Sequence, residues 1–141
     1  MMTATREIAR SAPDVFAFLA DAANNPKWQN GMKTCEWITP APVAVGSRYD
    51  REASFLGRPV LSTFEVLEFD PGHRILIEST KSTFPIRVER RVDSLTASTC
   101  RVKAEIEGGP SVPGSVQRLV GWLAQRAVDR DYNRLVTLLE D

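Results

Sequence analysis

The sequence is poor in the residues on which most catalytic and metal sites depend. Its 141 residues include one histidine and two cysteines. A hydrolase triad of the common type needs a histidine beside its nucleophile, and a zinc site needs clustered cysteine and histidine ligands. His73 lies inside a predicted turn, and Cys35 and Cys100 are far apart in the chain. We therefore expect no metal, no cofactor and two reduced, partly buried thiols.

Nucleotide-binding signatures are also missing. Neither a G-x-G-x-x-G pattern nor a P-loop occurs in the chain. The segment GGPSVPG, residues 108–114, is glycine-rich and precedes a predicted helix, so it could hold an anion. Nothing that resembles a nucleotide motif accompanies it, and a plain connection between a strand and a helix is the favoured interpretation.

Charge of one sign and long apolar runs are absent as well. The chain has 18 basic and 18 acidic residues, so its formal net charge is zero. A nucleic acid or an anionic membrane would favour a basic excess on one face, and the neutral composition argues against both partners. No apolar run is long enough to span a bilayer, and residues 1–11 lack the apolar core of a signal peptide. We expect a cytoplasmic protein without membrane insertion.

The first third of the chain predicts one strand and two short helices. Residues 5–9 alternate in polarity, which favours a strand with Ile8 facing inward. Ser11 can cap a helix. Its apolar stripe consists of Val15, Phe18, Leu19 and Ala22. Pro26 follows the end of that helix and can begin a second turn or two, which Gly31 would end.

Later segments predict six strands and one long helix. The hydrophobic period changes to two, and short turns such as DPGH indicate antiparallel neighbours. The predicted strands cover residues 34–38, 47–55, 59–69, 74–79, 84–93 and 100–107, with a loop at 94–99. The final helix, about 115–140, has a broad apolar stripe formed by Val116, Leu119, Val120, Leu123, Ala127, Tyr132, Leu135, Val136 and Leu139. The order of elements predicts a single α+β domain, residues 1–141, in which a curved seven-stranded sheet wraps around the long helix and leaves room for a ligand.

The order and spacing of these segments resemble the SRPBCC superfamily of START-like, pollen-allergen-like helix-grip proteins, in particular its polyketide cyclase/dehydrase branch. The segments that carry the resemblance are APDVFAFLADAANNPKW, VGSRYD, FLGRP, VLEFDPGHR and the terminal DYNRLVTLLED. The resemblance implies an elongated cavity for an apolar or amphipathic molecule. It also implies that Trp28 lies at the cavity rim as a lid anchor. The alternative is that Trp28 closes one end of the core, as large aromatic side chains often do.

Strand parity places an arginine among the inward positions of each of two strands. Tyr49, Arg51 and Phe55 share one face, and Arg90 lies among the apolar positions of a later strand. A guanidinium in apolar surroundings must pair with a carboxylate or stay near water. Glu68 can be that carboxylate only if its phase of the strand faces inward. The opposite phase is equally apolar, so the inward face of that strand stays open.

The inward positions of Arg51 and Arg90 have two interpretations. In the first, they line the cavity and orient a carboxylate, phenolate or enolate oxygen of a ligand. In the second, they lie at strand ends with exposed tips, or a bulge shifts the parity. Trp37, Phe64 and Trp122 are further candidates for the cavity wall. Trp122 could instead belong to an exposed patch for self-association.

Binding or carriage of a small hydrophobic or aromatic molecule, without turnover, is the favoured function. The alternative is a polyketide cyclase- or dehydratase-like enzyme in which Arg51 or Arg90 stabilises an enolate and Tyr49 acts as an acid. A third candidate is a protein-interaction module that uses the C-terminal helix face. The candidate ligand-binding residues are Trp28, Trp37, Tyr49, Arg51, Phe55, Phe64, Glu68, Arg90 and Trp122. The identity of the ligand and the oligomeric state stay open.

Overall fold

The computed structural model describes residues 1–55, 57–109 and 111–141, and within them one sheet and a long C-terminal helix dominate. The strands are β1 (Met2–Ile8), β2 (Met32–Trp37), β3 (Arg48–Phe55), β4 (Arg58–Asp70), β5 (Arg74–Ser82), β6 (Ile86–Thr96) and β7 (Thr99–Gly108). The helices are α1 (Ala12–Ala20), η1 (Ala22–Asn24), α2 (Asn25–Trp28) and α3 (Gly114–Glu140). The described strands form a seven-stranded antiparallel sheet in the order β1-β7-β6-β5-β4-β3-β2, which confirms the predicted helix-grip fold.

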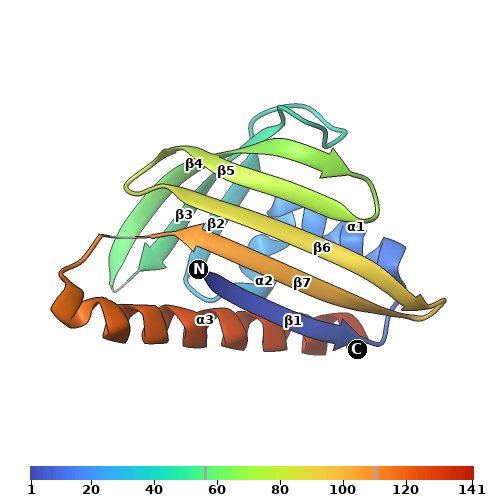
Figure 1. The fold of residues 1–141 in the computed structure, drawn as a ribbon. Helices are drawn as coiled ribbons and strands as arrows, with labels where there is room; N and C mark the ends of the chain where they lie inside the picture. Colours follow the sequence, from blue (N-terminus) through green and yellow to red (C-terminus); the bar gives the residue numbers. More distant parts are fainter. Residues whose placement is uncertain (56, 110) are drawn as a thin grey trace.

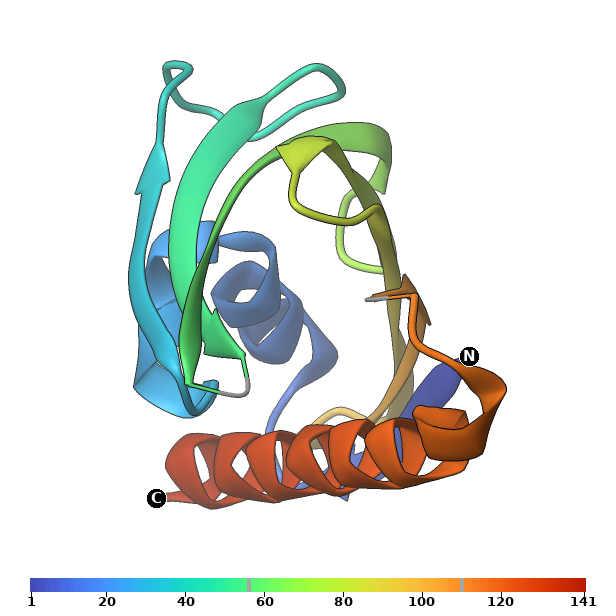
Figure 2. The same cartoon turned by 90° about the vertical axis from the view of Figure 1, so that its left-hand side faces the viewer.

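The sheet curves around the helices. In Figure 1, α3 runs along the edge formed by β1. Figure 2, turned by 90°, shows the sheet arching over α1 and α2, with α3 on the side opposite the arch. In Figure 1 the first turns of α3 lie at the end of the sheet where β7 ends. The inner, concave face of the sheet therefore has two ends, one near α1 and one near the start of α3.

The end near α1 holds a dense apolar core. The side chain of Ser11 accepts a hydrogen bond from the N–H of Asp14 (3.4 Å), which confirms the predicted cap. The buried residues of α1 are Ala12, Val15, Phe16, Leu19 and Ala20. Phe16, rather than the predicted Phe18, is thus fully part of the stripe, and its ring packs against Phe69 with centroids 5.8 Å apart. Phe18 is half-buried, because the stripe begins one turn earlier, at Ala12.

A bulge in β4 decides which residues of this strand face inward. Phe64 and Val66 are fully buried, so the phase that includes them faces the core. The register shifts between Val66 and Glu68, and the extra residue reverses the phase. Phe69, opposite a buried residue of β5, then faces inward, and Glu68 faces solvent. In β4, therefore, the phase of Phe64 and Val66 faces inward before the bulge, and the phase of Phe69 faces inward after it.

The predicted loop at 94–99 is wrong in extent. β6 continues to Thr96 and β7 begins at Thr99, so the two strands form a tight hairpin. The hydroxyls of Thr96 and Thr99 lie 2.7 Å apart and close its end. Threonine and serine favour turns in sequence, but here they also fit the pleat of a strand.

α3 is buried along its second half only. Its buried residues are Tyr132, Leu135 and Leu139. The exposed fractions of Val116, Leu119, Trp122 and Leu123 are 40%, 58%, 54% and 41%. The broad apolar stripe predicted for this helix is therefore covered at one end and open to solvent at the other. None of the described helices combines the length and the apolar character that crossing a bilayer requires.

Candidate functional site

A row of aromatic rings crosses the inner face of the sheet. Trp37 lies opposite Tyr49 in the β2–β3 register, and Tyr49 lies opposite Phe64 in the β3–β4 register. The rings of Tyr49 and Phe64 stack with centroids 5.4 Å apart, and Trp37 meets Tyr49 edge-on at 5.2 Å. Trp37, Tyr49 and Phe64, three of the predicted cavity residues, are thus neighbours in the structure. They pack against one another and do not form the wall of one open cavity.

A second row, two residues further along each strand, is polar. Cys35 lies opposite Arg51, Arg51 opposite Ser62, and Ser62 opposite Ser82. The two serine hydroxyls are 2.7 Å apart. The guanidinium carbon of Arg51 lies 4.6 Å from the centroid of the Phe64 ring, so a cation rests on the aromatic row. Strand parity predicted that Arg51 faces inward, and in the structure its side chain lies over the buried ring of Phe64 on the inner face.

Arg51 is left without an acid. Its Nε atom is buried and has no hydrogen-bond acceptor among the described residues. Burial lowers the pKa of Arg51, the expected effect of apolar surroundings on a cation. Its ordinary pKa is so high that the group stays charged at neutral pH. The second row therefore contributes an uncompensated positive charge to the inner face.

Arg90 is buried more deeply than Arg51, on β6. Only 7% of its surface is exposed. Its Nε–H donates to the Tyr132 hydroxyl on α3 (3.0 Å), and its guanidinium carbon lies 5.2 Å from the centroid of the Trp28 ring. Trp28 meets Tyr132 edge-on, with centroids 4.9 Å apart. Arg90, Trp28 and Tyr132 thus form a contact group that joins β6, α2 and α3. Tyr132 was read from the sequence only as an apolar stripe residue, because its hydroxyl has no signature there.

Within the part of the chain described, neither Arg51 nor Arg90 forms an ion pair with a carboxylate. Glu68, the predicted partner, forms an ion pair with Arg74 on the outer face. The prediction for Glu68 is wrong, because the bulge turns its side chain away from the interior.

The neutral groups near these cations hold their protons tightly. Burial raises the pKa of the Tyr49 phenol and of the Cys35 thiol, and the nearby arginine charges oppose these shifts only in part. The side-chain amide of Asn25 donates to the Cys35 sulfur (3.6 Å), while its Oδ1 atom is buried and finds no donor among the residues that the structure describes. The Nε1 atom of Trp28 is likewise buried, with no acceptor in the described part of the chain. This set can hold an anionic oxygen, and at neutral pH it offers neither a carboxylate nor an imidazole base.

Trp28 and Phe64 are fully buried, so side chains fill the interior at their level. Trp28 therefore packs inside the core. The half-buried residues of the inner face lie toward the other end of the sheet and include Met32, Ala53, Ile86 and Ile106, besides Arg51. We call this set the open half of the inner face. Ile86 and Ile106 lie near the end of β7, the last strand before α3.

A pocket of about 260 Å³ lies at the rim between α1 and the connection from β2 to β3. It is lined by Ala17, Ala20, Asp21, Trp37, Thr39, Pro40, Ala41, Val43 and Ser47. The indole N–H of Trp37 donates to Asp21 here (2.9 Å). Trp37 thus belongs to the rim as well as to the aromatic row.

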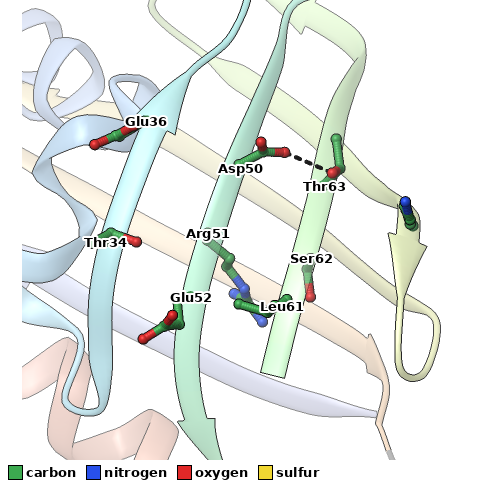
Figure 3. Close-up of a pocket in the computed structure, with 9 residues that line it drawn as sticks. Thr34, Glu36, Asp50, Arg51, Glu52, Leu61, Ser62 and Thr63 are labelled. Carbon is green, nitrogen blue, oxygen red and sulfur yellow. Dashed lines mark hydrogen bonds between the residues drawn. The ribbon is translucent and has the colours of Figure 1, made fainter. Parts of the chain in front are cut away.

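A larger pocket of about 380 Å³ spreads over the outer face of β2, β3 and β4 (Figure 3). Its lining includes Thr34, Glu36, Asp50, Arg51, Glu52, Leu61, Ser62, Thr63 and Lys81. The hydroxyl of Thr63 donates to Asp50 (2.7 Å). Eight of these nine residues are polar or charged, so the pocket does not resemble a site for an apolar guest. Neither pocket is the predicted hollow between the sheet and α3.

Two candidates fall outside the site. Trp122 is exposed on α3, with the Arg126 guanidinium 4.8 Å from the centroid of its ring, so it does not line the inner face. Phe55 ends β3 at the position that parity predicted, and its side chain lies outside the described residues.

Solved structures with this fold include proteins of several kinds. A Thermus thermophilus protein is 19% identical with a TM-score of 0.81, covering 96% of this chain and 94% of that chain. A START superfamily protein from Mycobacterium smegmatis is 16% identical with a TM-score of 0.76, covering 99% and 96%. An aromatase/cyclase from Streptomyces sp. R1128 is 15% identical with a TM-score of 0.77, covering 99% and 92%. At these identities the likeness shows the fold alone.

No curated protein matches the sequence. The family described as polyketide cyclase / dehydrase and lipid transport, in contrast, matches residues 1–140. That span is nearly the whole chain, and it agrees with the resemblance drawn from the order of the sequence segments. The chain belongs to the polyketide cyclase / dehydrase and lipid transport family.

Proposed function

We propose that the chain binds a small, largely apolar molecule through one anionic oxygen group, which Arg51 holds at the open half of the inner face while the buried charge of Arg90 nearby adds to the attraction. The observation that carries this proposal is the pair of inward guanidinium groups without a carboxylate partner among the described residues. An uncompensated buried charge costs several kcal/mol of folding free energy, which a bound anion would recover. Arginine suits carboxylate and phenolate oxygens because it offers several donors in one plane.

Apolar contacts for the rest of the molecule come from the same half of the sheet. Met32, Ala53, Ile86 and Ile106 are half-buried there, so a guest can cover them without displacing the filled end of the core. The gain would be about 25 cal/mol for each Å² of apolar surface removed from water. The lipid-transport part of the family description supports this proposal.

A cyclase- or dehydratase-like enzyme is the second candidate. The family description and the likeness of fold to an aromatase/cyclase favour it. In that case the guanidinium groups would stabilise an enolate oxygen, and the site would act mainly by positioning the chain. The buried phenol of Tyr49 is a weak acid because burial raises its pKa. Binding without turnover therefore stands as the proposed function.

Matched pairs of acids and alcohols test the role of the two arginines. Naphthoic acid with naphthyl methanol, and decanoic acid with decanol, differ within each pair chiefly in the carboxylate. We expect at least one acid to bind more tightly than its alcohol in isothermal titration calorimetry. Arg51→Met should weaken the binding of that acid about tenfold or more, because a charged hydrogen bond is lost. Arg90→Met should weaken it in the same direction, because a nearby positive charge is lost.

Arg48→Met is the control for this experiment. Arg48 lies on the outer face of β3, paired with Glu65 at 2.8 Å, so its loss should leave the affinity unchanged. Equal affinities of acid and alcohol for the wild-type chain would contradict the proposal. Unchanged acid binding in both interior variants would contradict it as well.

A further inference from the structure

The outward side of α3 carries a line of positive charge. Arg126, Arg130 and Arg134 recur at every fourth residue, which places them on one side of the helix, and all three are exposed. Among the described residues they form no ion pair. Several exposed arginines of the sheet are paired instead: Arg48 with Glu65, Arg87 with Glu78, and Arg101 with Glu7.

The acidic residues within α3 all contact the body of the protein. Asp129 forms an ion pair with β1 (3.4 Å). Asp131 accepts from the backbone N–H of Asn30 (3.0 Å), and Glu140 accepts from the backbone N–H of Ala9 (2.9 Å). Charge is thus segregated across the helix, although the formal net charge of the chain is zero. The expectation drawn from net charge, that an anionic membrane is not a partner, did not account for this local arrangement.

Exposed apolar residues continue the same side of the helix toward its start. Leu119 and Leu123 precede Arg126 at spacings that keep all three on one side, and Val116 and Trp122 flank them. The Arg126 guanidinium lies over the Trp122 ring, which joins the apolar part to the basic part. We call this set the α3 outer face; its members are Val116, Leu119, Trp122, Leu123, Arg126, Arg130 and Arg134.

We propose that the α3 outer face docks on a lipid surface that carries anionic headgroups. The apolar side chains would enter the boundary between headgroups and acyl chains, as interfacial amphipathic helices do. The arginines would contact lipid phosphates, and Trp122 would lie at headgroup depth. This inference does not depend on the proposed ligand, since none of its residues contacts Arg51 or Arg90.

A second copy of the chain fits this face less well. If two α3 helices packed through it, each arginine would meet an apolar residue or another arginine, because the acidic residues of α3 point toward the body. A protein partner would need a concave surface of its own, since neither pocket includes a residue of α3. A lipid surface is fluid and conforms to an exposed helix without any preformed groove.

Vesicle sedimentation tests the proposal. The probes are vesicles of phosphatidylcholine alone and vesicles of phosphatidylcholine and phosphatidylglycerol in equal amounts. We expect partitioning into the mixed vesicles only, weakened by added salt, with a blue shift of tryptophan emission that Trp122→Phe removes. The triple variant Arg126→Gln, Arg130→Gln, Arg134→Gln should lower the partition coefficient about a hundredfold. Leu119→Ser with Leu123→Ser should lower it about tenfold or more.

A matched triple variant controls for net charge. Arg48→Gln, Arg87→Gln and Arg101→Gln remove the same charge from paired positions on the sheet, and binding should stay within about twofold of wild type. Failure to partition into the mixed vesicles would overturn the proposal. An equal loss in both triple variants would also overturn it.

Retention on immobilised polyglutamate that depends on the α3 outer face, without vesicle binding, would assign the face to an acidic protein instead. A dimer in sedimentation velocity that Leu119→Ser dissociates would assign it to a second copy.

Discussion

Both halves of α3 carry apolar side chains, but only the second half contains buried ones. Leu135 and Leu139 are buried against the body, whereas Leu119 and Leu123 face solvent. The side-chain amide of Gln125 donates to the carbonyl of Thr3 (2.8 Å), near the start of β1. Before that point the helix extends past the beginning of β1 (Figure 1). The difference teaches that helical periodicity identifies an apolar stripe, while the length of the neighbouring strand decides how much of it is buried.

The largest expected effect separates the two halves directly. Leu135→Ala should lower the free energy of unfolding by about 2–5 kcal/mol, because it leaves a cavity in a filled core. Leu123→Ala, the matched change in the exposed half, should stay within about 0.5 kcal/mol of wild type. Urea unfolding followed by circular dichroism measures both. Similar losses for the two variants would mean that the first half is covered in solution.

A smaller loss of stability is expected when the hydrogen bond between Tyr132 on α3 and Arg90 on β6 is removed. Tyr132→Phe leaves the buried Nε–H of Arg90 without its acceptor, so unfolding should become easier by about 1–3 kcal/mol. The double variant Tyr132→Phe with Arg90→Met should cost less than the sum of the single variants, because the donor disappears with the acceptor. Strictly additive costs from urea unfolding would show that the two side chains do not depend on each other.

The smallest expected effect is a pH dependence of the stability, caused by Asp131 in the second half of α3. Burial raises the pKa of Asp131, while the N–H of Asn30 and the charges of Arg134 and Arg130 oppose the shift only in part. The folded state then penalises the carboxylate at neutral pH, and this penalty fades as the pH falls through the folded pKa toward the unfolded value. Asp131→Asn, which keeps an acceptor for Asn30, should raise the urea midpoint at neutral pH. Its advantage should shrink on acidification, and an advantage that is independent of pH would contradict this cause.

Much of the fold follows from sequence because its signals are local. The period-two segments, the cap at Ser11 and the turn before Arg74 each depend on a few neighbouring residues. Strand parity also placed Arg51 and Arg90 on the inner face, since side chains alternate strictly along an uninterrupted strand.

The remaining features depend on contacts between distant segments. The bulge that turns Glu68 outward is set by pairing between β4 and β5, which no window of sequence contains. The bond from Arg90 to Tyr132 joins β6 to α3 across 42 positions of the chain. The exposure of Leu119 and Leu123 depends in the same way on where β1 begins.

Native mass spectrometry of the purified protein tests the central claim most directly. If Arg51 holds an anionic group and the charge of Arg90 adds to the attraction, the wild-type chain should carry one small acidic molecule per chain, identifiable after extraction. The variant with both Arg51→Met and Arg90→Met should lose that molecule, while Arg48→Met keeps it. A bound neutral molecule that persists in the double variant would contradict the claim. So would a bare wild-type chain that no acid of a lipid and aromatic library stabilises against heat.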